Sequence, residues 1–201
     1  GIIKVDNRFV AEGTETPMIP RVGLRMQLSE ILNDLTYYGR GPEENYRDRR
    51  TSQFIGEYTT PIKDLYEPYI RPQENEHRTD IYWCALTTKQ KAGLLFIADR
   101  TFELNASNYL LGSLDSGETI DNGAPRTNET NHRHLTDPQP VKQVDMFIDY
   151  RMMGVGGDNS WGAIAHEPYL IRPGVENAIE YGFSIVPFDK KADYKNLIYQ
   201  Y

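Results

Sequence analysis

The chain has 201 residues, of which 39% are hydrophobic and 25% charged, and its formal net charge is −7. This length and hydrophobic content fit one globular domain, whereas the acidic balance and the lack of a basic run with interleaved aromatics argue against nucleic acid as a partner. The longest apolar run, GLLFIA at 93–98, is far shorter than the ~20 residues of a membrane-spanning helix, so we expect a soluble protein without a membrane association.

Alternation of apolar and polar residues predicts β-strands along most of the chain. The first predicted strand, RVGLRMQL at 21–28, places Val22, Leu24, Met26 and Leu28 on one face. Further strands are predicted at 79–87, 93–98, 103–111, 144–152, 169–172 and 178–186, with short helices at 29–33 and 192–199. The single cysteine, Cys84, excludes an internal disulfide and is expected to be a small buried side chain in its strand.

Long polar segments at 39–50, 68–78 and 115–140 separate the predicted strands. No repeat and no linker divides the chain. We therefore predict an all-β fold, an antiparallel β-sandwich that spans residues 1–201 as one domain and carries long loops. Loops of this length often carry function.

The acidic clusters Glu43-Glu44 and Glu74-x-Glu76 are candidates for glycosidic cleavage, which needs two carboxyls with separate roles. Adjacent side chains of a strand point to opposite faces, so the sequence spacing does not assemble such a pair. We interpret these residues as solvated loop acids and predict no catalytic residue in this chain.

The segment NHRHL places His132 and His134 two residues apart, on one face if the segment is a strand. Such a pair binds a metal only with a third ligand, and the spacing of His77 and His166 does not supply one. We predict no metal site, and a polar role in a loop or pocket for the pair.

The segment YYGRGPEENYRDR at 37–49 leaves two interpretations open. Gly39 and Gly41 can take positive φ, and Pro42 fixes the exit from a tight turn. The polar residues that follow either bind a ligand or satisfy the hydrogen bonds of their own loop.

The segment GVGGDNSW at 154–161 combines glycines, small polar residues and a tryptophan: Gly154, Gly156, Gly157, Asp158, Asn159, Ser160 and Trp161. The glycines allow sharp turns and close backbone approach, and the polar residues can bond loop amides. Trp161 then either stacks its indole on the flat face of a pyranose or packs into the core near the end of the sandwich.

Five segments occur in an order that resembles the C-terminal domain of the large β-galactosidases of glycoside hydrolase family 2. They are PRVGLRMQL (20–28), YYGRGPEENYRDR (37–49), LYEPYIRPQENEHR (65–78), NHRHL (131–135) and MMGVGGDNSWG (152–162). The resemblance implies a supersandwich of the galactose mutarotase-like type. It also implies that the catalytic glutamates and the magnesium and sodium sites of the parent enzyme lie in or near a (β/α)8 barrel that this chain lacks, so no cofactor is expected here.

The resemblance further implies a site. Trp161 would contact the sugar on its aglycone side, next to Asp158 and Asn159, with Gly154, Gly156, Gly157 and Ser160 supporting the loop. A second, less specific pocket would involve His132, His134, Glu74, Asn75 and Arg78. The parent enzyme would hydrolyse terminal β-D-galactosides such as lactose with retention, and the partners would be the barrel of the same polypeptide, the carbohydrate and further copies of the enzyme.

The family domain begins well before PRVGL. We therefore expect either an N-terminally truncated C-terminal domain of a multidomain enzyme or a sandwich that is trimmed at its N-terminal side. A soluble bacterial protein is implied, in the cytoplasm or the periplasm. Two other functions stay open: a freestanding carbohydrate-binding module that uses Trp161, and an aldose 1-epimerase-like enzyme in which His132, His134 and Glu74 move the anomeric proton.

Overall fold

The computed structural model describes residues 1–12, 17–70, 73–114, 136, 138–159, 162–173 and 178–200. In this part of the chain the strands form one eight-stranded antiparallel sheet and the helices are short, which confirms the all-β antiparallel prediction. Its strands are β1 Ile3–Phe9, β2 Arg21–Ser29, β3 Asp34–Gly41, β4 Phe54–Pro61, β5 Arg78–Thr87, β6 Gly93–Ser107, β7 Gln143–Met152 and β8 Ile179–Phe188. Four single-turn helices accompany them: η1 Ile62–Asp64, α1 Leu111–Leu114, η3 Glu167–Tyr169 and α2 Tyr194–Leu197.

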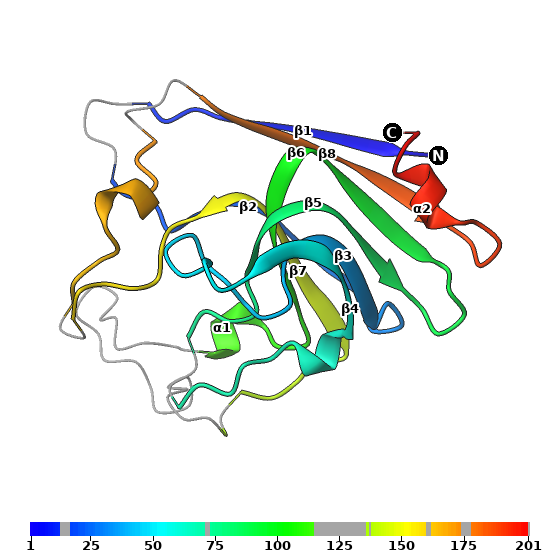
Figure 1. Ribbon diagram of the computed structural model, residues 1–201, viewed down its shortest axis with the longest axis horizontal. Helices are drawn as coiled ribbons and strands as arrows, with labels where there is room; N and C mark the ends of the chain where they lie inside the picture. The colour runs from blue at the N-terminus through cyan, green and yellow to red at the C-terminus, as the bar shows by residue number, and fades with distance from the viewer. Residues whose placement is uncertain are drawn as a thin grey trace.

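The sheet forks at its longest strand (Figure 1). The first part of β6, residues 93–98, pairs with β8, and the last part, residues 103–107, pairs with β7. Strand β1 extends the β8 arm and β2 extends the β7 arm, while β5, β3 and β4 continue the sheet on the other side of β6. The sheet therefore curls into a sandwich whose two arms separate at residues 99–102.

The two faces of the central strands are buried in different cores. In β5, Cys84 and Leu86 belong to the main core between the arms, whereas Trp83 and Ala85 belong to a second cluster on the opposite face. The short helix α2 covers that second cluster, where the ring of Tyr194 packs on those of Trp83 and Phe188. Cys84 is fully buried, as predicted.

Several element predictions were incomplete. The sequence pattern did not predict β1, β3 or β4. Strand β4 is an edge strand, and its sequence FIGEYTTP has no strict alternation of apolar and polar residues. Its side chains are exposed or half-buried. The polar residues 99–101 interrupt the apolar pattern of β6 because they lie at the fork, where the strand loses one neighbour.

Two predictions were wrong. Residues 29–33 form the end of β2 and a turn instead of a helix. Tyr169 ends η3, and residues 170–172 follow it without joining the sheet. The helix predicted at 192–199 exists but is confined to α2. In the described ranges, no helix combines the length and apolarity required to cross a membrane.

Candidate functional site

Residues 153–159 are here called the glycine loop. The base of this loop is held against the segment that follows β3. The carboxylate of Asp48 accepts hydrogen bonds from the backbone N–H groups of Val155 (3.2 Å) and Gly156 (2.7 Å). Next to them the N–H of Gly154 donates to the carbonyl of Tyr169 at 2.9 Å. One charged side chain thus binds two successive amides and holds the loop base against a distant segment.

Two of the loop glycines allow close packing, and neither has positive φ. A Cβ at Gly154 would lie 2.7 Å from Cγ of Asp48, and one at Gly157 would lie 2.2 Å from the carbonyl oxygen of Ala163. Both separations are far inside van der Waals contact, so a larger residue would displace the loop base.

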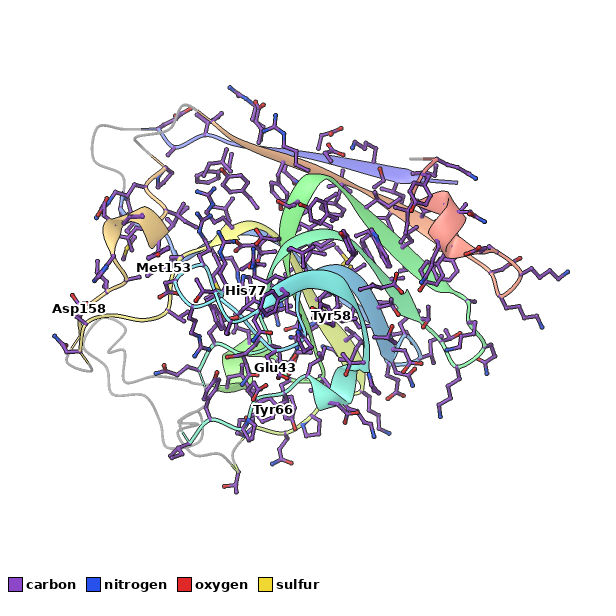
Figure 2. The ribbon with its side chains drawn as sticks, in the orientation of Figure 1. Glu43, Tyr58, Tyr66, His77, Met153 and Asp158 are labelled. Atoms are coloured by element: carbon purple, nitrogen blue, oxygen red, sulfur yellow. The ribbon has the colours of Figure 1, made fainter. Side chains whose placement is uncertain are left out.

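The far end of the loop is exposed. Figure 2 shows Asp158 at one edge of the molecule, with Met153 and then His77 progressively further inside. Asp158 Oδ1 lies 2.8 Å from Nε2 of His166, and both side chains are exposed. Asn159 is exposed as well. Ser160 and Trp161 lie outside the described residues, so their roles stay predictions.

A cleft of about 700 Å³, here called the loop cleft, lies beside the glycine loop. Its walls include Tyr46, Arg49, Tyr69, Ile70, Glu74 and Met153, together with Gly154, Val155 and Ile164 of the loop region. The cleft therefore brings together residues around 46–49, 69–70 with 73–74, and 153–155 with 163–165, which sequence alone does not connect. Aromatic and aliphatic faces with a few polar groups are typical of small-ligand sites.

One wall of the loop cleft is a compact arrangement of two aromatic rings and an ion pair. The Arg49 guanidinium lies 4.7 Å from the centroid of the Tyr46 ring and donates to the Tyr69 hydroxyl at 2.8 Å. Both Arg49 and the Tyr69 hydroxyl donate to Glu44. Cation–π contact and hydrogen bonds thus orient the Tyr46 and Tyr69 rings at the cleft wall.

Behind the cleft, a buried network connects Glu74 to Glu103. Glu74 Oε1 accepts from Arg21 Nη2 (2.9 Å) and Asn105 Nδ2 (3.0 Å), while Asn105 Oδ1 accepts from Arg21 Nη2 (3.0 Å). His77 lies between them, with Nδ1 2.7 Å from Asn105 Oδ1 and Nε2 3.0 Å from Glu103 Oε2. Because both ring nitrogens face acceptor oxygens, the buried imidazole of His77 carries two protons and a positive charge.

The pKa of His77 agrees with that assignment. Burial lowers the pKa of the imidazole, but the hydrogen bond and the charge of Glu103 outweigh burial, so the pKa lies above its usual value. Glu103 Oε2 also accepts from the N–H of Met152 at 2.6 Å. The network therefore attaches the end of β7, where the glycine loop begins, to β6.

Of the predicted second pocket, the structure places only Glu74 on a cleft. Asn75 bonds both backbone groups of Glu67 and closes its own loop. Arg78 is buried and donates to the carbonyls of Pro42 and Glu76 and to the Tyr37 hydroxyl. Both side chains thus bind backbone groups of neighbouring segments, and their role in a pocket stays a prediction. His132 and His134 lie outside the described residues.

The segment 37–49 turns out to serve both of the interpretations left open. Asn45 is fully buried and bonds the backbone of Arg40, Glu43 and Thr79, so this part satisfies its own loop. Tyr46 and Arg49 face the cleft. Neither Gly39 nor Gly41 has a positive φ. Both lie in β3, at positions where a Cβ would collide with Ile81 or with the Tyr37 hydroxyl.

The sequence reasoning missed Asp48, Tyr46, Arg49 and Tyr69 as members of the site. The motifs at 37–49 and 65–78 both contain Tyr and Arg, which are common in binding surfaces. This pattern could have pointed to the site. The convergence of these residues was not readable, because each hydrogen bond joins segments that are far apart along the chain.

Glu74 is the only carboxylate on the described lining of the loop cleft, and Arg21 and Asn105 already occupy it. Glycosidic cleavage needs two carboxyls. Among the described residues no group of three or more His, Cys, Asp or Glu is placed to hold a metal ion.

We expect Asp48→Ala to loosen the loop base. The variant should lose about 1–3 kcal/mol of unfolding free energy, because two loop amides lose a charged acceptor. Hydrogen exchange at Val155 and Gly156 should accelerate at least tenfold while exchange in β5 is unchanged. Asp158→Ala, which removes an exposed carboxylate from the same region, is the control. Equal exchange at Val155 and Gly156 in wild type and Asp48→Ala would show that Asp48 does not hold the loop.

Comparison with known proteins places this geometry in a family. The family model described as beta galactosidase small chain matches residues 1–185. The chain is 32% identical over 171 residues to a β-galactosidase of Priestia megaterium, and this match covers 85% of the chain and 15% of that protein. It is also 32% identical over 158 residues to a β-galactosidase of Vibrio cholerae, with 79% of the chain and 13% of that protein covered. The chain thus spans about one seventh of the length of the relatives it matches, and it belongs to the β-galactosidase small-chain family.

Proposed function

We propose that this chain is a non-catalytic part of a β-galactosidase that hydrolyses terminal β-D-galactosides such as lactose, and that it forms one wall of the substrate mouth. Trp161 contacts the aglycone sugar, and residues elsewhere in the enzyme cleave the bond. Family membership supports the enzyme class. The ligand-sized loop cleft, lined by residues such as Val155 and Ile164 on both sides of the Trp161 position in the sequence, supports the position of the wall.

The observation that carries the proposal is the anchoring of the glycine loop at the rim of the cleft. Asp48 holds the loop base, and the described residues on both sides of Trp161 are exposed. Three large apolar side chains around the cleft are exposed as well: Ile70 by 89%, Val155 by 43% and Ile164 by 52%. Such a rim fits a surface that another part of the enzyme covers.

The remaining parts of the enzyme follow from the same proposal. A (β/α)8 barrel supplies the two catalytic glutamates, together with the magnesium and sodium sites, and packs against the loop cleft. In the intact enzyme this chain orients the aglycone and excludes water from one side of it. We also propose that the enzyme assembles as a homo-oligomer. The name that the relatives share says nothing about assembly.

Trp161→Ala in the complete β-galactosidase is expected to raise KM for lactose roughly 5- to 30-fold, which corresponds to about 1–2 kcal/mol of lost stacking. Trp161→Phe should restore most of the affinity because it keeps an aromatic face. The rate kcat should change less than KM. If KM and kcat of Trp161→Ala both equal the wild-type values, Trp161 is not a substrate contact.

A freestanding carbohydrate-binding module is the second candidate, because the loop cleft has the size and lining of a ligand site on its own. Titration of the 201-residue chain with lactose and with galactose separates the two functions. Saturable binding in the millimolar range or tighter supports the module, and the absence of binding supports a wall that works only beside its barrel. The family membership gives no support to the aldose 1-epimerase alternative.

A further inference from the structure

A second cleft, of about 840 Å³, lies at the fork of the sheet. This fork cleft is bordered by β6 where it passes from one arm to the other, by Tyr150 and Arg151 of β7, and by Tyr181 of β8. Arg47 and Arg50, from the segment that follows β3, form the opposite wall. Glu103 lines the fork cleft, and Glu74 lines the loop cleft. The buried network that connects these two residues therefore lies between the two clefts.

The acidic side chains of the fork cleft are nearly all engaged. Asp80 binds both Arg40 and Arg50, and Glu103 binds His77. At the outer rim Glu180 pairs with Arg8, and Asp99 with Lys4. Asp6 lies beside Asp99, against the backbone of Gly182. The charges that most affect the pKa of Arg47 are those of Arg151, Glu103 and Arg50, and Asp6 is not among them.

Three arginines of the cleft, in contrast, lack an acidic partner within ion-pair distance in the part of the chain that is described: Arg47, Arg100 and Arg151. Arg100 is exposed, whereas Arg47 and Arg151 are half-buried. Arg151 lies with its guanidinium carbon 4.9 Å from the centroid of the Tyr150 ring. Tyr150 thus backs the guanidinium of Arg151 at the cleft wall.

Arg47 is the least satisfied of the three. Its Nε is buried and has no hydrogen-bond partner in the described residues. Burial, followed by the charge of Arg151, lowers the pKa of the Arg47 guanidinium. A buried donor without an acceptor is rare in native proteins and calls for a partner. A carboxylate or phosphate oxygen would accept this hydrogen bond and also offset the positive charge of the guanidinium.

We propose that Arg47 and Arg151 form an oxyanion-binding site in the fork cleft, for a carboxylate or phosphate group. Guanidinium groups match both anions in a bidentate geometry, and an anion between them removes the repulsion of the two like charges. The group comes either from a small molecule or from a carboxylate side chain elsewhere in the longer enzyme. The site is independent of the lactose-related function of the loop cleft.

The test is a calorimetric titration of the 201-residue chain with sodium phosphate and with glutarate, in a chloride buffer near neutral pH and at constant ionic strength. We expect saturable binding in the millimolar range or tighter, weakened at least tenfold by Arg47→Gln and by Arg151→Gln. The matched control is Arg172→Gln, which removes the same charge from an exposed arginine that pairs with Glu167 and should bind both anions like wild type.

Urea unfolding keeps the result interpretable if a variant binds poorly. Without added anion, Arg47→Gln should be at least as stable as wild type, because a poorly satisfied buried charge is removed; phosphate should then stabilise wild type but not the variant. Absence of saturable binding by either anion at tens of millimolar, or an equal response in all four proteins, overturns the proposal.

A final titration, on the complete β-galactosidase, separates the two sources of the anion. Unchanged phosphate affinity in the complete enzyme identifies a small-molecule site. Loss of phosphate binding there, while the 201-residue chain still binds, identifies a carboxylate supplied by the rest of the enzyme. Both outcomes presuppose binding by the 201-residue chain and therefore support the site.

Discussion

Glu103→Ala should lower the free energy of unfolding by about 3–5 kcal/mol, because it leaves the buried positive charge of His77 without its counter-charge. Glu103 is 6% exposed, and one of its oxygens accepts both from His77 Nε2 and from the N–H of Met152. The substitution therefore strands a cation and a backbone donor at once. Urea denaturation near neutral pH measures the loss.

The matched control is Glu180→Ala, which removes a carboxylate from an ion pair with Arg8 whose side chains are 65–66% exposed. Solvent screens that pair, so the change should be below about 1 kcal/mol. If Glu103→Ala were as mild as Glu180→Ala, the imidazole of His77 would be neutral in the folded protein, contrary to the two acceptors that face it.

Stability should fall as the pH rises from about 5 to about 9, and Glu76 should be a main cause. Glu76 is 1% exposed, has a positive φ of 64°, and Oε2 of its carboxyl is buried without a hydrogen-bond partner in the described residues. Burial raises the pKa of Glu76 to about 8, although the hydrogen bond from Ser107 and the charge of Arg78 oppose the rise.

The direction follows from the two states of the protein. The unfolded chain releases the Glu76 proton near its ordinary pKa of 4.5, whereas the folded chain keeps it up to about pH 8. The contribution is complete below the unfolded pKa and is lost by about 1.4 kcal/mol per pH unit until the folded pKa is passed. The total is on the order of a few kcal/mol. His77, with its raised pKa, contributes in the same direction.

Glu76→Gln keeps the shape of the side chain and is neutral at every pH, so its stability should depend much less on pH between about 5 and 9. Glu43→Gln is the control, since Glu43 is exposed and should leave the wild-type slope unchanged. Unfolding free energies of the three proteins, measured by urea denaturation across this range, check the prediction. Parallel profiles for wild type and Glu76→Gln would mean that Glu76 is already ionised in the folded protein.

The buried network also explains why the loop cleft has a defined shape. Glu74 faces the cleft, but its position depends on Arg21 from β2 and Asn105 from β6. The same network reaches Met152, from which the chain enters the glycine loop. Substitutions at Glu103 should therefore disturb the cleft as well as the stability. The wall of a binding site needs such support, since small displacements weaken contacts with a ligand.

Strand faces were predictable where the pattern is strong. The alternation of Leu24, Met26 and Leu28 gave the inward face of β2, and these residues do pack on the main core. The exposed edge strand β4 carried no such signal, because neither of its faces is deeply buried. Strand β6 was divided in two by the polar residues at the fork, whose exposure is a property of the sheet and not of the strand.

The site was predictable only in part, for the same reason. The glycine loop could be recognised from its composition and from its place among the family motifs. The hydrogen bond between Asp48 and Gly156 could not be predicted, because the two residues are 108 positions apart in the chain. Asn75 and Arg78 looked like pocket residues because polar side chains in a long loop normally face solvent or ligand. In the structure both side chains hydrogen-bond to backbone groups of neighbouring segments.

By itself the sequence determined the all-β class, the family and the existence of a glycine-rich loop, because alternation, composition and ordered motifs are local properties that need no partner. Only the tertiary structure decided which polar groups are satisfied and which charges remain without a partner. His77 became a buried cation, and Arg47 a buried donor without an acceptor, through residues on other strands. Burial and pairing are set by segments far apart in the chain, and the energies of both depend on distances that a linear pattern does not contain.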